Sequence, residues 1–308
     1  MGKIAVLFAG QGAQQPGMGR EFFDTLPQVK AMYEKAEVCR PGTINDCFES
    51  TQEALNITST TQPCLYLTDL ACYEALKERG IEADVFAGFS LGEIAALNAS
   101  GILNDKDAFK LVCIRGEAMY QAGLDTAGGM LAILKQERSR VEELCRDFGV
   151  YPVNYNCPGQ IAVSGEADRI NVMKDALLAQ NVRCMPIAVS GAFHTPYMES
   201  ASLKVRETLG DMEVNPPKSP IYSNRTANVY DDKREAIIDN ISAQVTSSVR
   251  FEDLLKQMYA DGVDIFIECG PGKTLSGFVK RTLSDVTILN VNDCASLEAT
   301  VLKVKELR

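Results

Sequence analysis

Short apolar runs alternate along the chain with longer segments in which apolar residues recur at helical spacing. Four of these runs are rich in β-branched or aromatic residues and end at turn residues: KIAVLFAG (3–10), ADVFAGFS (83–90), DIFIECG (264–270) and DVTILNVN (285–292). Strands that alternate with helices in this way are typical of a parallel sheet covered by helices on its faces. We therefore predict an α/β fold with a parallel sheet.

The pattern changes between residues 126 and 192. We expect, in chain order, strand 128–134, helix 139–149, strand 151–156, strand 159–165, helix 167–180 and strand 183–189. This β-α-β-β-α-β order is that of the split βαβ, or ferredoxin-like, unit. We expect residues 126–192 to form a small inserted subdomain, and residues 1–125 with 193–308 to form the larger α/β domain.

Composition narrows the class of protein. The chain has 308 residues, a formal net charge of −10 and ten scattered cysteines without a C-x-x-C pair. No stretch approaches the ~20 apolar residues that span a bilayer, so we expect no membrane association and a cytoplasmic location. The negative charge argues against broad nucleic-acid binding, although a local basic patch could still bind an acidic partner. We interpret the cysteines as reduced thiols.

A serine between two glycines follows the second predicted strand. The sequence Gly88-Phe-Ser90-Leu-Gly92 matches G-x-S-x-G at a strand-to-helix corner, the context in which this motif exposes a nucleophile. The N-terminal end of the following helix would stabilise negative charge near the serine hydroxyl. The alternative is a glycine-rich connection with an incidental serine.

His194 is the only histidine in the chain, which excludes sites with several histidine ligands. It precedes Thr195-Pro196, a typical helix start, and the positive end of a helix disfavours a protonated imidazole. A neutral His194 could take the proton of Ser90, which is the pairing that acyl transfer requires. No Asp or Glu stands out as a third partner that would orient this histidine.

Arg115 falls on the apolar side of the predicted helix 107–123. The wet side carries Lys110, Glu117 and Gln121, whereas Arg115 lies with residues such as Leu111 and Met119. A buried guanidinium is costly unless it is paired. It could form an internal ion pair or extend its head to water; alternatively, it could bind a substrate carboxylate through two parallel N–H bonds.

Two glycine-rich segments resemble nucleotide-binding loops without completing the pattern. FAGQGAQQPG (8–17) has Gln15 where a Rossmann loop needs its third glycine, and ECGPGKT (268–274) follows Ile267 where a phosphate loop needs glycine. We expect glycine to allow close backbone approach in both. The first loop follows a strand that ends at the same sheet edge as Ser90, and it could supply a backbone N–H to an oxyanion hole.

Seven blocks, in order, carry a resemblance over essentially the whole chain: FAGQGAQ (8–14), TQPCLYLTDLA (61–71), GFSLGE (88–93), IRGEAM (114–119), NYNCPGQIAVSG (154–165), GAFHTPYM (191–198) and ECGPGKTLSGFVKR (268–281). They resemble the malonyl-CoA:acyl carrier protein transacylases of the acyltransferase family. The resemblance implies an α/β-hydrolase-like large domain with a ferredoxin-like insertion, in agreement with the pattern above.

The resemblance also implies a role for each matching residue. Ser90 would be the nucleophile, His194 the base and Arg115 the site of the malonyl carboxylate. Backbone N–H groups of Gln11 and Leu91 would form the oxyanion hole, and the main-chain carbonyl of Gln244 would orient the histidine in place of an acid. Phe193 would favour malonyl over bulkier groups. Members of the family usually have histidine where this chain has Phe89, which cannot exchange a proton.

The implied reaction transfers malonyl from malonyl-CoA to the phosphopantetheine thiol of holo acyl carrier protein through a malonyl-serine, with ping-pong kinetics, for fatty acid synthesis. We expect no cofactor, no metal ion and a monomer. Two related readings stay open: a trans-acting acyltransferase for polyketide synthesis, and a serine thioesterase or hydrolase. A nucleotide-binding module is the third alternative.

Overall fold

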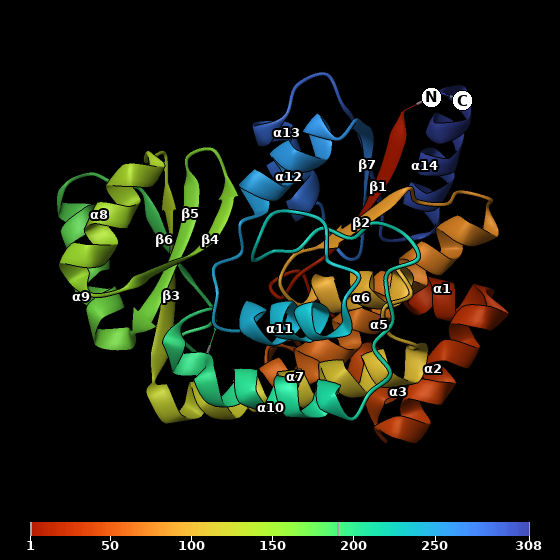
Figure 1. The fold of residues 1–308 in the computed structure, drawn as a ribbon, viewed down its shortest axis with the longest axis horizontal. Helices are drawn as coiled ribbons and strands as arrows, with labels where there is room; N and C mark the ends of the chain where they lie inside the picture. Colours follow the sequence, from red (N-terminus) through yellow and green to blue (C-terminus); the bar gives the residue numbers. More distant parts are fainter. Residues whose placement is uncertain (1, 190, 308) are drawn as a thin grey trace.

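The computed structural model describes residues 2–189 and 191–307 as two lobes, each built around a four-stranded sheet (Figure 1). The large sheet is parallel, has the order β2-β1-β7-β8 and consists of β1 (Lys3–Phe8), β2 (Val85–Gly88), β7 (Val263–Cys269) and β8 (Thr287–Val291). Each strand falls in one of the four apolar runs, with β7 beginning one residue before its run, so the predicted α/β class with a parallel sheet is confirmed.

The register of the large sheet brings three loops together. Phe8 at the end of β1 pairs with Gly88 at the end of β2 and with Cys269 at the end of β7. The chain therefore leaves all three strands at one edge, towards Gln11, Ser90 and the second glycine-rich loop. Crevices at the carboxyl ends of parallel strands are the usual binding sites of open α/β sheets.

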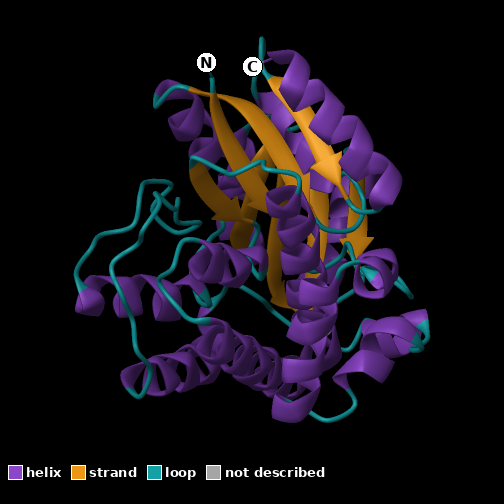
Figure 2. Ribbon diagram, turned by 90° about the vertical axis from the view of Figure 1, so that its right-hand side faces the viewer, coloured by secondary structure: helices purple, strands orange, loops and turns teal. Residues whose placement is uncertain are grey.

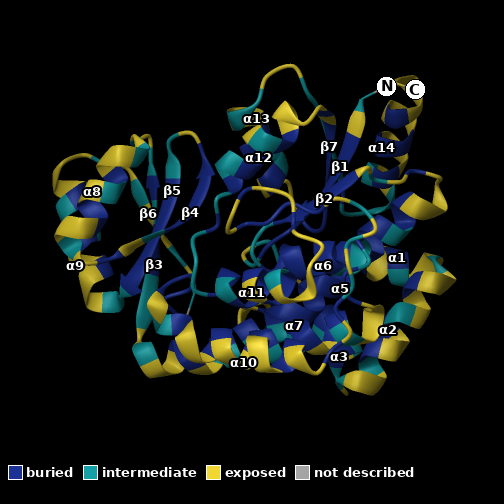
Figure 3. Cartoon of the chain, viewed as in Figure 1, coloured by how far each residue is buried: buried dark blue, intermediate teal, exposed yellow. Residues whose placement is uncertain are grey.

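Helices cover both faces of the large sheet (Figure 2). Alternation along β1 sends Ile4, Val6 and Phe8 to one apolar core and Ala5 and Leu7 to another. The first core includes residues of α5 (Thr58–Glu78), α6 (Gly92–Ala99) and α14 (Cys294–Leu307), and the second includes residues of α12 (Phe251–Ala260) and α13 (Thr274–Thr282). Figure 3 shows that α5 and α6 are largely buried.

Further helices surround this centre. The long helix α7 (Asp105–Thr126) packs against α5 and against α10 (Glu199–Gly210), which in turn packs on α11 (Arg234–Gln244). The other helices described in the large lobe are α1 (Arg20–Thr25), α2 (Pro27–Cys39), α3 (Thr43–Phe48), α4 (Gln52–Leu55) and the short 3-10 helix η1 (Pro196–Met198).

The small lobe confirms the β-α-β-β-α-β order predicted from the sequence. Its antiparallel sheet has the order β4-β5-β3-β6 and consists of β3 (Gly128–Leu134), β4 (Tyr151–Cys157), β5 (Gln160–Glu166) and β6 (Cys184–Ile187), with helices α8 (Arg138–Phe148) and α9 (Ala167–Ala179). These two helices and the sheet enclose an apolar core of their own. That core supports our proposal that residues 126–192 are an inserted subdomain.

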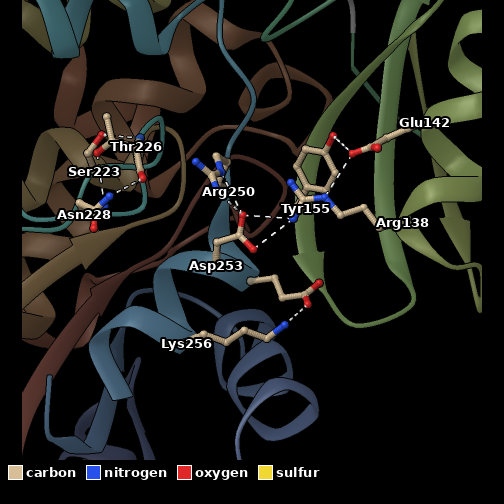
Figure 4. Close-up of polar contacts among 10 residues, drawn as sticks. Arg138, Glu142, Tyr155, Ser223, Thr226, Asn228, Arg250, Asp253 and Lys256 are labelled. Atoms are coloured by element: carbon tan, nitrogen blue, oxygen red, sulfur yellow. Dashed lines mark hydrogen bonds and ion pairs between the residues drawn. The ribbon is translucent and has the colours of Figure 1, made fainter. Parts of the chain in front are cut away.

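Backbone bonds and an ion pair join the two lobes. The Val249 N–H donates to the Val153 carbonyl at 2.7 Å, and the Tyr155 N–H donates to the Val249 carbonyl at 2.9 Å. Arg138 of α8 contacts both carboxylate oxygens of Asp253 at 3.1 and 3.2 Å and lies over the Tyr155 ring (Figure 4). The segment before α12 is thereby fixed to β4 of the small lobe.

Three global features bear on the chemistry. Within the part of the chain that the structure describes, no helix is both long enough and apolar enough to cross a bilayer. In the same residues, no cluster of His, Cys, Asp or Glu side chains could hold a metal ion. All ten cysteines are free thiols.

Candidate active site

Ser90 lies on a sharp turn between β2 and α6. Its φ of 52° is in the left-handed region, which is unfavourable for a side-chain-bearing residue and typical of a nucleophile elbow. A Cβ on Gly88 would lie 2.0 Å from the Gly92 carbonyl carbon, so the turn needs glycine there. The Asn224 side chain fixes the turn, because Oδ1 accepts from the Ser90 N–H at 2.6 Å and Nδ2 donates to the Gly88 carbonyl at 2.6 Å.

His194 faces this serine from the loop before η1. The distance from Ser90 Oγ to His194 Nε2 is 2.7 Å, and His194 Nδ1 lies 3.0 Å from the Gln244 carbonyl and 3.1 Å from the Ser247 carbonyl. Because carbonyls only accept hydrogen bonds, Nδ1 must carry the proton. Nε2 is then free to accept the proton of the serine hydroxyl, which is the tautomer that a general base needs.

The environment keeps the imidazole neutral. Burial, and after it the nearby Arg115 charge, lower the pKa of His194 from 6.5 to about 4, against the opposing effect of the two carbonyls. We expected a neutral ring because of a helix start. Thr195 does cap the turn η1, but burial and Arg115 are the main causes of the neutral state.

Arg115 points into the interior, as its place on the predicted helix indicates, and only 1% of the residue is exposed. Its Nη1 donates to Gln62 Oε1 at 2.8 Å, and its Nη2 donates to Gln244 Oε1 at 3.0 Å and to Ser90 Oγ at 3.3 Å. Burial lowers the pKa of Arg115 to about 10, so the guanidinium stays charged near neutral pH. Within residues 2–189 and 191–307 it forms no ion pair with a carboxylate.

A buried carboxylate behind the serine was missed by the sequence analysis. Glu93, in the first turn of α6, is 1% exposed and accepts hydrogen bonds from the Asn224 N–H at 3.1 Å, from Gln244 Nε2 at 3.0 Å and from the Tyr230 hydroxyl. Burial raises the pKa of Glu93 to about 7, against these hydrogen bonds and the Arg115 charge. The signal available in the sequence was a single acid within the apolar helix EIAALNA (93–99).

The two expected oxyanion donors border the same site. Leu91 is the N-cap residue of α6, and the loop with Gln11 follows β1. Neither backbone N–H donates to another atom in the described part of the protein. Close approach of the loop to the elbow requires glycine at position 10, where a Cβ would lie 2.5 Å from the Phe89 carbonyl oxygen. Unpaired N–H groups at the end of a sheet next to a nucleophile can stabilise a developing oxyanion.

A cavity of about 190 Å³ opens over this arrangement. Its lining includes Gln11, Ser90, Phe193 and His194. Phe89 also lines it, and the ring packs against two phenylalanines of the second core, Phe251 at 5.2 Å and Phe278 at 5.9 Å between ring centroids. The position that usually carries histidine in the resembling family is therefore part of an aromatic cluster here.

The structure brings the expected residues into one place from five separate segments. Ser90, His194 and Arg115 are in direct contact or one contact apart, and the Gln244 carbonyl lies next to the histidine. Besides Glu93, the residues that sequence reasoning missed are Asn224, Gln62, the Ser247 carbonyl and the side chain of Gln244.

Comparison with known proteins supports this picture over the full chain. A family model described as an acyl transferase domain matches residues 6–301. The malonyl CoA-acyl carrier protein transacylase of Bacillus subtilis is 36% identical over 99% of this chain and 98% of its own length, and that of Staphylococcus aureus strain MW2 is 35% identical over 94% and 96%.

Solved structures of similar proteins have the same fold. The malonyl CoA-acyl carrier protein transacylase of Clostridium perfringens has a TM-score of 0.93 and 37% identity over 99% of this chain and 98% of that one. A malonyl-transacylase solved in complex with its type II polyketide synthase acyl-carrier protein has a TM-score of 0.93 and 30% identity over 98% of this chain and 99% of that one.

Proposed function

This chain belongs to the acyl transferase family, and from that premise we propose that it transfers a malonyl group from malonyl-CoA to the phosphopantetheine thiol of acyl carrier protein, for fatty acid synthesis. The observation that carries the proposal is the contact between Ser90 and His194 beside an arginine that forms no ion pair with any carboxylate among the residues that the structure describes. A hydrolase of neutral esters would have no use for a buried cation next to its nucleophile.

The first half-reaction loads the serine. The malonyl carboxylate binds Arg115, the Ser90 oxygen attacks the thioester carbon, and the hydroxyl proton moves to His194 Nε2. The oxyanion forms between the N–H groups of Gln11 and Leu91. The carbon–sulfur bond then breaks, and the proton on His194 passes to the sulfur of the departing CoA.

The second half-reaction is the reverse with a new thiol. The phosphopantetheine sulfur of the carrier protein attacks the malonyl-serine, its proton moves to His194 Nε2, and the Ser90 oxygen regains a proton as the ester bond breaks. Because CoA leaves before the carrier protein reacts, the kinetics are ping-pong. Phe193, which lines the cavity, restricts the space beside the acyl group and so favours malonyl over bulkier groups.

Intact mass spectrometry tests the proposal. After mixing with malonyl-CoA we expect one malonyl adduct, which maps to Ser90, is absent in Ser90→Ala and disappears when holo acyl carrier protein is added. Serine to alanine removes one oxygen atom and leaves the elbow geometry accessible. An adduct on another residue, or release of free malonate at the rate of loading, would contradict the proposed transferase.

A polyketide carrier is the second candidate acceptor. The observation in its favour is the relative of the same fold whose solved complex contains a type II polyketide synthase acyl-carrier protein. Comparing transfer rates to fatty acid and polyketide carriers decides between the two. We further propose that the chain acts as a monomer in the cytoplasm, since one chain supplies the serine, the histidine and the arginine.

A further inference from the structure

The Gln244 carboxamide connects the parts of the site that must act together. Its Nε2 donates to the Ser90 carbonyl at 2.8 Å and to Glu93 Oε2 at 3.0 Å, while its Oε1 accepts from Arg115 Nη2 at 3.0 Å. The main-chain carbonyl of the same residue accepts from His194. The direction in which this amide points therefore determines what Arg115 meets on that side.

Glu93 and the Ser90 carbonyl together determine that direction. A carboxylate oxygen only accepts hydrogen bonds, so it requires the NH₂ end of the Gln244 amide to face it. The carbonyl end is then turned towards Arg115. If the amide were reversed, its NH₂ group would face the guanidinium, which only donates, and its oxygen would face a carboxylate and a carbonyl.

The arrangement also leaves the guanidinium available. A fully buried arginine normally needs a paired acid, but a direct ion pair would occupy the N–H groups that a substrate carboxylate needs. Arg115 instead donates to the amide oxygens of Gln62 and Gln244. The negative charge of Glu93 lies one amide away, on the other side of Gln244. The Arg115 charge opposes the rise in the pKa of Glu93, and Glu93 opposes the fall in the pKa of Arg115.

We propose that Glu93 is a positioning residue for malonyl recognition, which acts through the Gln244 carboxamide to hold an amide oxygen against Arg115 and so keeps the guanidinium oriented for the substrate carboxylate. The proposal rests on the proposed function, because it assumes that Arg115 binds that carboxylate. Glu93 itself touches neither substrate nor the reacting atoms.

Two variants separate the effect of the length of the Glu93 side chain from the effect of its charge. Glu93→Gln keeps the length of the side chain and can turn its amide oxygen towards Gln244, but it has no charge. Glu93→Asp keeps the charge but is one methylene shorter, so its oxygens withdraw from Gln244. The measured quantity is the ratio of kcat/KM for malonyl-CoA to kcat/KM for acetyl-CoA in the acylation of Ser90. A ratio within one preparation does not depend on the fraction of protein that is folded.

We expect Glu93→Asp to lower the malonyl-to-acetyl ratio about tenfold, the effect of about one hydrogen bond to a charged group, and Glu93→Gln to keep it within about threefold. The matched control is Tyr230→Phe, which removes another hydrogen bond to the same carboxylate without touching Gln244 and should leave the ratio unchanged. In an Arg115→Met background, Glu93→Asp should no longer change the ratio.

The outcomes that overturn the proposal are distinct. A ratio unchanged in Glu93→Asp, or lowered equally by Tyr230→Phe, would mean that the carboxylate only stabilises the fold. A ratio lowered in Glu93→Gln but kept in Glu93→Asp would assign the effect to charge rather than to position. Failure of the unsubstituted protein to form a malonyl-serine would instead refute the proposed function itself.

Discussion

Replacing Arg115 by methionine tests the centre of the proposed chemistry. Methionine fills much of the same buried volume but has no N–H groups and no charge. It leaves the side-chain oxygens of Gln62 and Gln244 without their present donor, at a cost to folding of about 1–3 kcal/mol for each unpaired group. That cost applies whichever acyl group is transferred.

The effect on malonyl transfer is much larger than the effect on acetyl transfer. In Arg115→Met a malonyl carboxylate would enter the buried site without a cation, and removing one partner of a buried ion pair costs about 3–5 kcal/mol. At about 1.4 kcal/mol per tenfold, kcat/KM for malonyl-CoA should fall by roughly two to four orders of magnitude. Acetyl-CoA has no carboxylate, so its transfer does not depend on an ion pair with Arg115. Acetyl transfer is affected only indirectly, through loss of the long 3.3 Å contact between Arg115 and Ser90.

Rapid-quench acylation with malonyl-CoA and acetyl-CoA measures both rates on one preparation. We expect the malonyl-to-acetyl ratio to fall by at least about 100-fold in Arg115→Met. Arg115→Lys is the matched control, which keeps a charge but loses the planar fork and should recover part of the ratio. Equal losses for the two substrates would refute the carboxylate site and favour a purely structural arginine.

The site supports four further predictions. Since burial lowers the pKa of His194 to about 4, the histidine should stay unprotonated as the pH falls from about 8 to about 5.5. Acylation should therefore slow far less over this range than the roughly tenfold that a pKa of 6.5 would cause. A stopped-flow pH profile with an acid limb near 6.5 would contradict this prediction. The same shift means that the unfolded state binds a proton first, so this group's contribution to stability is lost as the pH falls from 6.5 towards 4, which pH-dependent denaturant titration can measure. In Gly10→Ala the new Cβ would overlap the Phe89 carbonyl oxygen and should displace the loop. The rates of malonyl and acetyl transfer should then fall alike, by about 10²-fold if an oxyanion donor is lost. An unchanged rate would remove that loop from the mechanism. Phe89→His should keep activity but lower the free energy of unfolding by about 1–3 kcal/mol, because a polar ring would replace one that packs on Phe251 and Phe278. Calorimetry measures this change. A stability equal to that of the unsubstituted protein would mean that the aromatic cluster contributes little.

Local features of the sequence predicted the scaffold and several residues of the site. The four apolar runs became β1, β2, β7 and β8, because β-branched and aromatic residues between turns favour strands wherever both faces can be buried. The helical period of residues 107–123 correctly predicted that Arg115 lies on the buried side of the helix. The glycines around Ser90 predicted a tight corner, and the structure shows that a Cβ there would overlap the backbone. These features depend on a few consecutive residues, so they can be predicted from the sequence without knowledge of the tertiary structure.

Only the tertiary structure decided which distant groups meet. Asn224 and the side chain of Gln244 carry no local pattern that marks them, yet the first holds the serine turn and the second faces the arginine. The neutral state of His194 likewise depends on burial by other segments and on the charge of Arg115. Hydrogen-bond direction and desolvation are set by neighbours in space, often more than 100 positions away along the chain. The sequence by itself therefore determined the strands, the elbow and the inward arginine, whereas the orientation of the base and of the arginine's partners became fixed only when the folded chain excluded water from around them.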